Sequence, residues 1–243
     1  MKVYPAVTNP TARALLSPKA SGRSFEVIVI DDGSTDDSFA QLAALQAADP
    51  RLRVIRFRRN FGQTAAFAAG FAHARGRLVV TSDGDMQNDP RDIESMVQLS
   101  DRDDVDIVCG WRKDRKDAFL TRHVPSVAAN WLLGLVSGIR LHDNGCSLKV
   151  FRSEVVKPLR LRPGMHRYLP AIASQLGGRV TEAVVNHRPR RFGHSKYGLS
   201  RTFTVIADLM HLRGLMRQAV NPATETTGLY EVAEVLETPA LTR

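Results

Sequence analysis

The sequence predicts an α/β protein whose mostly parallel central sheet is covered by helices on both faces. Short apolar runs rich in β-branched residues alternate with segments of helical period along residues 25–109. Acidic turn residues follow two of these runs, where strands of a parallel sheet would end. The chain has 243 residues, 43% of them hydrophobic, and can bury a substantial core in one large domain or two small ones.

The first half of the chain contains four predicted strands and three predicted helices. The strands are 25–30, 53–57, 78–81 and 105–109, and the helices are 36–48, 62–74 and a third that begins at Asp89 and Pro90. Helix 36–48 places Leu42 and Leu45 on one face, and the small residues of 62–74 allow close packing against a sheet. Proline is typical of a first helical turn, and we interpret Asp89 as the cap of the third helix.

The second half has a less regular pattern. Strands are predicted at 146–151 and 180–185, and helices at 127–136 and 202–216. We therefore expect three parts. These are a segment with little hydrophobic periodicity at 1–24, one domain at 25–217 and a loosely ordered tail at 218–243.

Two carboxylates follow the predicted strand 78–81. Asp83 and Asp85 are separated only by Gly84, and carboxylates this close repel each other unless a cation lies between them. A divalent metal with oxygen ligands would remove that repulsion and would also hold substrate phosphates. The alternative is a polar turn that closes the strand, since Asp and Gly are common turn residues.

A second acidic pair, Asp31 and Asp32, ends the predicted strand 25–30. Ligands of open α/β sheets bind outside the carboxyl ends of the strands, so both acidic clusters are expected at one edge of the sheet. A solvated turn explains each cluster singly but is a weaker explanation of both. The sequence therefore predicts one shared site.

The net charge of +9 and the pI of about 10.1 indicate affinity for anions, whether nucleic acid, phosphorylated substrates or an acidic membrane surface. Aromatic residues make up 7% of the chain and are not interleaved with basic ones, so no nucleic-acid partner is expected. Cys109 and Cys146 are predicted to be buried thiols in a reducing cytoplasm. No apolar run approaches the ~20 residues of a membrane-spanning helix, and residues 1–16 lack the apolar core of a signal peptide.

Six motifs occur in order over about residues 25–210. They are 29–36 (VIDDGSTD), 60–63 (NFGQ), 83–87 (DGDMQ), 110–112 (GWR), 143–149 (DNGCSLK) and 190–197 (RRFGHSKY). In this order they resemble the family 2 glycosyltransferases, in particular the branch that moves a sugar from a nucleotide to a polyprenyl (dolichyl) phosphate. The resemblance implies a GT-A (Rossmann-like) fold, an inverting reaction, a nucleotide-sugar donor and a polyprenyl-phosphate acceptor.

The resemblance also implies roles for individual residues. Asp83, Asp85 and Gln87 match the group that binds a divalent metal, Mg²⁺ or Mn²⁺, and the diphosphate, and Asp85 is also a catalytic candidate. Asp143 matches the catalytic acidic residue near the acceptor. A phosphate acceptor is already ionised, so we expect Asp143 to orient the acceptor or the sugar rather than act as a strong base. A plain turn residue is the alternative for Asp143.

Further residues are predicted to contact substrate. They are Asp31, Asp32, Asn60, Arg112, Arg191 and Lys196. The first two lie near the nucleotide by resemblance, while arginine forks and a flexible lysine suit phosphate groups. For Arg122 a phosphate contact and a solvated helix residue are equally good interpretations.

Two features depart from the family pattern. The family begins with an apolar strand followed by Pro, an aromatic residue, Asn and Glu, which line the nucleotide base. Here no Glu follows Asn9, so segment 1–24 is expected to be altered or truncated, with activity impaired. Many relatives also carry transmembrane helices after the matching region, and none is predicted here. We expect a cytoplasmic enzyme whose helix 202–216 either packs on the sheet or makes a peripheral contact with anionic lipid at the cytoplasmic face of the membrane.

Three alternatives to an active transferase stay open at this point. An aspartate-nucleophile phosphohydrolase also places Asp-x-Asp after a strand, but after its first one. A nucleic-acid-binding protein is suggested by charge alone. An inactive relative that lacks a complete nucleotide-base pocket would follow from the unusual N-terminal segment.

Overall fold

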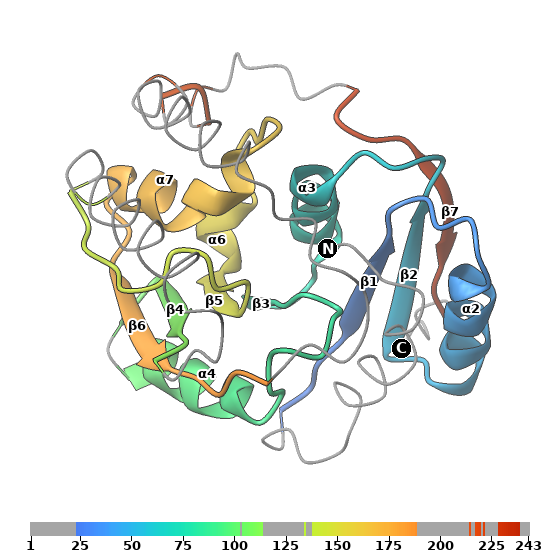
Figure 1. Cartoon of the computed structure of the whole chain (residues 1–243), viewed down its shortest axis with the longest axis horizontal. Coiled ribbons are helices and arrows are strands. Elements are labelled where there is room, and N and C mark those ends of the chain that lie inside the picture. Colours follow the sequence, from blue (N-terminus) through green and yellow to red (C-terminus); the bar gives the residue numbers. More distant parts are fainter. Residues whose placement is uncertain are drawn as a thin grey trace, which may run out of the picture.

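The computed structural model of the chain describes residues 23–102, 104–113, 134, 138–188, 214, 217–219, 221 and 228–238. Figure 1 shows an α/β arrangement of strands flanked by helices. The elements are β1 (Val27–Asp31), α2 (Ser38–Ala48), β2 (Leu52–Phe57), α3 (Gln63–His73), β3 (Leu78–Thr81), α4 (Asp92–Arg102), β4 (Ile107–Trp111), β5 (Lys149–Arg152), α6 (Ser153–Val156), the 3-10 helix η2 (Met165–Tyr168), α7 (Leu169–Gln175), β6 (Val180–Val184) and β7 (Val232–Leu236). The predicted α/β class is confirmed.

The strands form two sheets of mixed direction, in the orders β1-β2-β7 and β3-β5-β4-β6. β1 and β2 are parallel, as are β4 and β6, whereas the pairs β2–β7, β3–β5 and β4–β5 are antiparallel. The expectation of a mostly parallel sheet is corrected accordingly. β5 lies between β3 and β4 and is antiparallel to both. β3 and β4 therefore point in the same direction, although they are not hydrogen-bonded to each other. A buried apolar run looks the same in either direction, so its pattern does not reveal strand direction.

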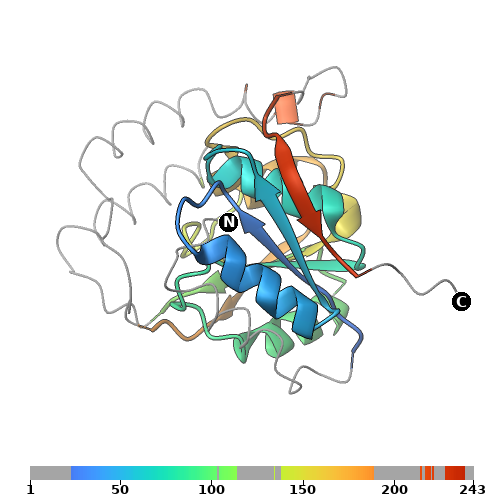
Figure 2. The same cartoon turned by 90° about the vertical axis from the view of Figure 1, so that its right-hand side faces the viewer.

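Helices cover both faces of the first sheet, as predicted (Figures 1 and 2). Successive side chains of a strand point to opposite faces. Val29 of β1 therefore shares a core cluster with Leu42 of α2, while Ile30 packs against Ala65 and Ala69 of α3. The small residues of α3 allow the close approach that the sequence predicts.

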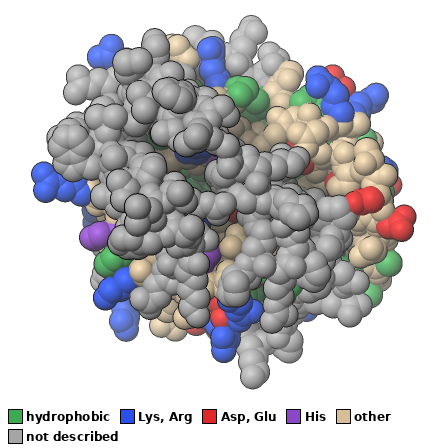
Figure 3. All heavy atoms as spheres, in the orientation of Figure 1, with side chains coloured by type: hydrophobic (Ala, Val, Ile, Leu, Met, Phe, Trp, Pro, Cys, Tyr) green, Lys and Arg blue, Asp and Glu red, His purple; other side chains and the backbone are tan. Residues whose placement is uncertain are grey.

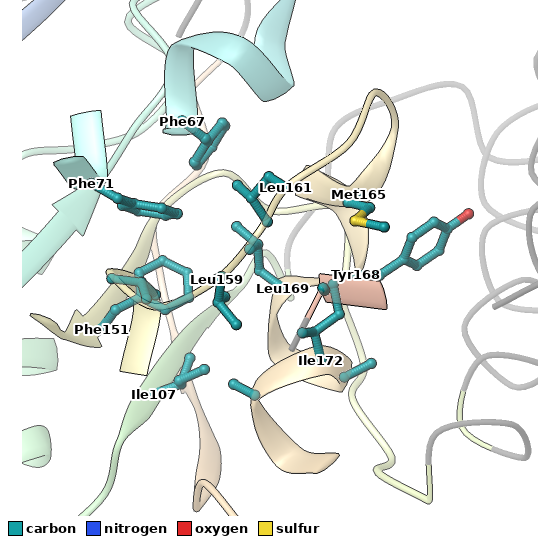
Figure 4. Packing of buried hydrophobic residues seen from close by; sticks show 14 of the residues in the cluster. Phe67, Phe71, Ile107, Phe151, Leu159, Leu161, Met165, Tyr168, Leu169 and Ile172 are labelled. Atoms are coloured by element: carbon teal, nitrogen blue, oxygen red, sulfur yellow. The ribbon is translucent and has the colours of Figure 1, made fainter. Parts of the chain in front are cut away.

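The second sheet is also covered on both faces. Met96 of α4 packs with Val108 and Val150 on one face. The other face holds the largest cluster, to which α3, η2 and α7 contribute. Figure 4 shows rings of α3 and β5 meeting there, with the centroids of Phe71 and Phe151 5.7 Å apart. Because α3 takes part in the cores of both sheets, it fixes one sheet relative to the other.

Most predicted elements exist with small shifts in their bounds. β3 has the predicted bounds, β4 ends two residues later than predicted, and α4 begins at Asp92 rather than at Asp89. The expected helices 127–136 and 202–216 lie almost entirely outside the described residues. Segment 1–24 lies outside them as well, apart from its last two residues.

The prediction of a loosely ordered tail is wrong where β7 lies. This strand pairs antiparallel with β2 and forms an edge of the first sheet (Figure 2). A register shift opposite Arg56 and Phe57 lets Val232 and Leu236 pack into clusters on opposite faces. The shift breaks the two-residue period by which a strand is recognised in a sequence.

Both cysteines lie in the protein interior. Cys109 and Cys146 are buried free thiols, as predicted, and burial raises the pKa of Cys109 to about 12. Among the described residues, no helix has both the length and the apolar character needed to cross a bilayer.

Candidate active site

Asp31 is a buried carboxylate at the end of β1. Its Oδ1 accepts the N–H of Ser34 at 3.0 Å, and Nε of Arg56 lies 3.7 Å from its Oδ2. Gly33 turns the chain with a φ of +72°, and a Cβ there would lie 2.4 Å from the carbonyl carbon of Arg59. The motif is therefore packed against the loop that follows β2, which fixes the direction of both aspartates.

Asp32 joins β1 to the start of α3. Its Oδ1 accepts the N–H of Phe61 at 2.7 Å, and its Oδ2 accepts the N–H of Gly62 at 3.0 Å. These two N–H groups lie at the start of α3, where the helix dipole is positive. Asn60 Nδ2 donates to the carbonyl oxygen of Asp32 at 3.2 Å. The structure thus brings the predicted residues Asp31, Asp32 and Asn60 together at the carboxyl end of β1.

Gln63 connects this group to the second acidic cluster. It is the first residue of α3, and its Nε2 donates to Oδ1 of Asp83 at 3.1 Å. The two clusters that were predicted to share one site are therefore joined through the start of α3, where Gly62 contacts Asp32 and Gln63 contacts Asp83. Sequence reasoning assigned no role to Gln63, although its place directly after Gly62 in a motif was the available signal.

β3 leads into a tight turn that carries Asp83, Asp85 and Gln87. The N–H of Gln87 donates to Oδ1 of Asp85 at 3.2 Å, and Met86 between them has a φ of +60°. Asp85 is buried, while Asp83 and Gln87 are partly exposed. The N–H of Asp83 donates to Oγ of Ser147 at 3.3 Å, a contact from the segment before β5 that the sequence did not reveal.

The donor set of this turn fits a divalent cation. Two carboxylates and an amide oxygen are hard ligands of the kind that Mg²⁺ and Mn²⁺ prefer. Among the described residues, no three His, Cys, Asp or Glu side chains form a group that could hold a metal ion by themselves. Magnesium is usually bound by one or two carboxylates together with substrate phosphates, so this set suits a metal shared with a diphosphate.

Arg112 and Asp143, both predicted site residues, form a bidentate ion pair. Nε and Nη2 of Arg112 lie 2.6 and 2.9 Å from the two carboxylate oxygens. Burial opposes the charge of Arg112, but the hydrogen bonds and charge of Asp143 outweigh it and raise the pKa of Arg112 above its usual value. Asp143 also lies four residues before Ser147, whose Oγ contacts the N–H of Asp83, so the ion pair and the Asp83–Asp85 turn share segment 143–147.

Glu182 of β6 holds the backbone beside Asp143. Its carboxylate accepts the N–H of His142 at 2.8 Å and that of Asp143 at 3.1 Å, and it pairs with His142 Nδ1 at 2.7 Å. The ring of Trp111 stacks on His142 with centroids 4.1 Å apart. The buried Lys149 donates to the carbonyl oxygens of residues 144 and 146. None of these supporting residues was predicted.

Asp89, predicted to cap a helix, caps the turn that leads into α4, and the helix itself begins three residues later. Its carboxylate accepts the N–H of Arg91 and forms ion pairs with Arg91 at 2.6 Å and with Arg188 at 2.5 Å. The hydrogen bonds from Arg91, with a smaller contribution from Arg188, overcome burial and lower the pKa of Asp89 to about 2. The predicted phosphate contacts Arg122, Arg191 and Lys196 lie outside the described residues.

The chain is similar to known proteins over most of its length. The family described as "Glycosyl transferase family 2" matches residues 9–159. A dodecaprenyl-phosphate galacturonate synthase of Rhizobium johnstonii is 46% identical over 201 residues, covering 82% of this chain and 60% of the relative. An undecaprenyl-phosphate 4-deoxy-4-formamido-L-arabinose transferase of Edwardsiella ictaluri is 34% identical over 199 residues, covering 82% and 61%. The chain thus spans about 60% of the length of these curated relatives.

Solved structures show the same fold. The glucosyl-3-phosphoglycerate synthase of Mycobacterium tuberculosis, in complex with phosphoglyceric acid, superposes with a TM-score of 0.66 at 20% identity, over 88% of this chain and 78% of that one. The same enzyme with Mn²⁺, UDP-glucose and phosphoglyceric acid gives a TM-score of 0.65 at 21% identity, over 88% and 77%. With the ordered motifs, these matches show that the chain belongs to glycosyl transferase family 2 and has a GT-A fold.

Proposed function

We propose that this chain transfers a sugar, with inversion, from a nucleotide-sugar donor to a polyprenyl phosphate. The observation that best supports the proposal is the arrangement of two groups of residues that follow the ends of β3 and β4. These groups are the Asp83–Asp85 turn and the Arg112–Asp143 pair, linked by segment 143–147, in which Ser147 Oγ accepts the N–H of Asp83 at 3.3 Å and Asp143 pairs with Arg112. The 46% identity to a dodecaprenyl-phosphate galacturonate synthase supports the choice of acceptor.

The donor half comprises the carboxyl ends of β1 and β3. Asp31, Asp32 and Asn60 shape the nucleotide side, while Asp83, Asp85 and Gln87 would hold Mg²⁺ or Mn²⁺. A divalent ion bound there would neutralise the negative charge that develops on the diphosphate leaving group. The complex of the mycobacterial enzyme with Mn²⁺ and UDP-glucose supports a metal in this role.

The acceptor half is organised around Arg112. A guanidinium has five N–H donors in a planar fork that matches both carboxylate and phosphate geometry. Asp143 holds this fork through Nε and Nη2, and the remaining edge of the guanidinium suits an acceptor phosphate oxygen. The nucleophile is then an already ionised phosphate oxygen, so Asp143 orients Arg112 and the acceptor and removes no proton.

We place the enzyme at the cytoplasmic face of the membrane, in peripheral contact. The net charge of +9 suits an anionic lipid surface, and Figure 3 shows Lys and Arg side chains in groups around the rim of the face in view. The catalytic unit would comprise the predicted segment 25–217 together with β7, which completes the first sheet, and no nucleic-acid partner is proposed.

The proposal is tested by incubating the chain with labelled nucleotide sugars, a polyprenyl phosphate in detergent, and Mn²⁺ or Mg²⁺. The panel includes a UDP-hexuronic acid, because the more similar of the two relatives is named for galacturonate. We expect labelled lipid whose anomeric configuration is inverted relative to the donor. The variant Asp85→Asn should lose this product while its circular dichroism spectrum and melting temperature stay close to those of the parent chain. Undiminished transfer by Asp85→Asn would contradict the proposal, and a trapped phospho-aspartate would favour a phosphohydrolase.

A further inference from the structure

The turn that carries Asp85 and Gln87 has an unusual backbone. Met86 lies between the two and has a φ of +60°, in the left-handed region that non-glycine residues rarely adopt. Such a conformation persists only where the surrounding structure holds it, and it is concentrated at functional sites. The contacts that hold this turn are therefore expected to control where Asp85 and Gln87 point.

A second segment of chain fixes the turn from outside. Arg188, about a hundred residues later, donates its N–H to the carbonyl oxygen of Gln87 at 2.9 Å. Gln87 Nε2 in turn lies 3.5 Å from the carbonyl oxygen of Arg188. Asn88 and His187 form an antiparallel bridge beside these contacts. Residues 87–88 and 187–188 thus behave as a short two-stranded ribbon directly after the turn.

The side chain of Arg188 stabilises this ribbon through an ion pair with Asp89. Its Nη2 lies 2.5 Å from Oδ2 of Asp89, whose side chain is only 2% exposed. Arg91 pairs with the same carboxylate, but its side chain is 81% exposed and it belongs to the same local turn. Only Arg188 therefore ties Asp89 to the distant segment among the contacts described.

We propose that Asp89 and Arg188 are positioning residues for the metal site, since their ion pair holds the left-handed turn at Met86 and so aims Asp85 and Gln87. The inference rests on the proposed function, because that function assigns the metal to Asp85 and Gln87. It adds two residues that contact neither metal nor substrate. Their loss should lower metal affinity beyond what any change in the stability of the fold explains.

The variant Arg188→Gln tests the proposal, because it removes the charge while keeping a polar side chain of moderate length. We measure Mn²⁺ binding in the presence of UDP by electron paramagnetic resonance, and hydrogen exchange of the amides of residues 84–88 without metal. The expected result is a Kd for Mn²⁺ at least tenfold higher and faster exchange in that segment. The conservative variant Arg188→Lys should recover part of both effects.

Arg91→Gln is the matched control, since it removes the exposed partner of the same carboxylate. Its Kd for Mn²⁺ should stay within twofold of the parent value. Parent-like Mn²⁺ binding and exchange in Arg188→Gln would overturn the inference, as would an equal loss in Arg91→Gln. A parent chain that binds Mn²⁺ with UDP but transfers no sugar would overturn the proposed function alone, and one that binds no Mn²⁺ would overturn both.

Discussion

Replacing Glu182 with alanine should destabilise the chain and misplace Asp143. The carboxylate is 11% exposed and accepts the backbone N–H groups of His142 and Asp143 at 2.8 and 3.1 Å. A hydrogen bond to a charged group contributes about 1.5–3 kcal/mol, and a buried donor left without a partner loses a similar amount. The third contact, to the His142 ring, counts little because that ring is largely exposed. Because neighbouring contacts are not additive, we expect a total loss of about 3 kcal/mol.

Urea denaturation followed by circular dichroism measures this loss, and the transfer assay measures the effect on Asp143. A displacement near 1 Å at a reacting group can cost about 100-fold in rate, so kcat should fall by about that factor. Glu182→Gln keeps one acceptor oxygen, so its loss of stability should be about half of that expected for Glu182→Ala. The control is Glu154→Ala, which removes an exposed glutamate of α6. Stability of Glu182→Ala within about 0.5 kcal/mol of the parent chain would refute the reasoning.

Two further predictions concern the turns of the site. Gly33→Ala combines a left-handed φ with a Cβ 2.4 Å from the carbonyl carbon of Arg59, whereas Gly62→Ala has a φ of +90° with no atom within 4 Å of its Cβ. We expect a loss of about 1 kcal/mol for Gly62→Ala and at least about 3 kcal/mol for Gly33→Ala by calorimetry, and equal losses would contradict the structure. Asp89 has a pKa of about 2 when folded, below the ordinary 3.8, so it stabilises the fold above pH 4 and that contribution disappears as the pH falls toward 2. Asp89→Asn should therefore lose less stability than the parent chain between pH 4 and pH 2 in urea titrations, and parallel curves would contradict the ion pairs.

Local sequence pattern predicted those parts of the fold that depend on local chemistry. β3 was placed at its observed bounds because four apolar or β-branched residues are followed by a polar turn. The placement of Asp32 and Asp83 on either side of the start of α3 was expected from a general property of α/β sheets, since ligands bind at the carboxyl ends of strands. The prediction of the family and of the GT-A fold depended on the order of six motifs. Composition and hydrophobic periodicity alone do not identify a family.

The supporting contacts were not predictable because they join residues far apart in the chain. Glu182 looks like an ordinary charged residue on the exposed side of a strand. It reaches the backbone of Asp143 only because β6 pairs with β4 in a register that sets Glu182 opposite Cys109. The pair Asp89–Arg188 likewise spans 99 positions and depends on the bridge between Asn88 and His187. A local pattern carries no information about such registers.

The acidic residues of the site share one arrangement, in which each carboxylate already has a donor. Asp32 accepts backbone N–H groups at the start of α3, Asp85 accepts the N–H of Gln87, and Asp143 accepts the fork of Arg112. These donors offset part of the repulsion between carboxylates that lie at the carboxyl ends of neighbouring strands, so they help to fix the direction of each carboxylate. A site arranged in this way before binding spends little free energy on reorganisation when charge develops on the leaving group. More distant contacts, such as those of Glu182 with the backbone N–H of Asp143 and of Arg188 with Asp89, would then act on the site by fixing where its carboxylates lie.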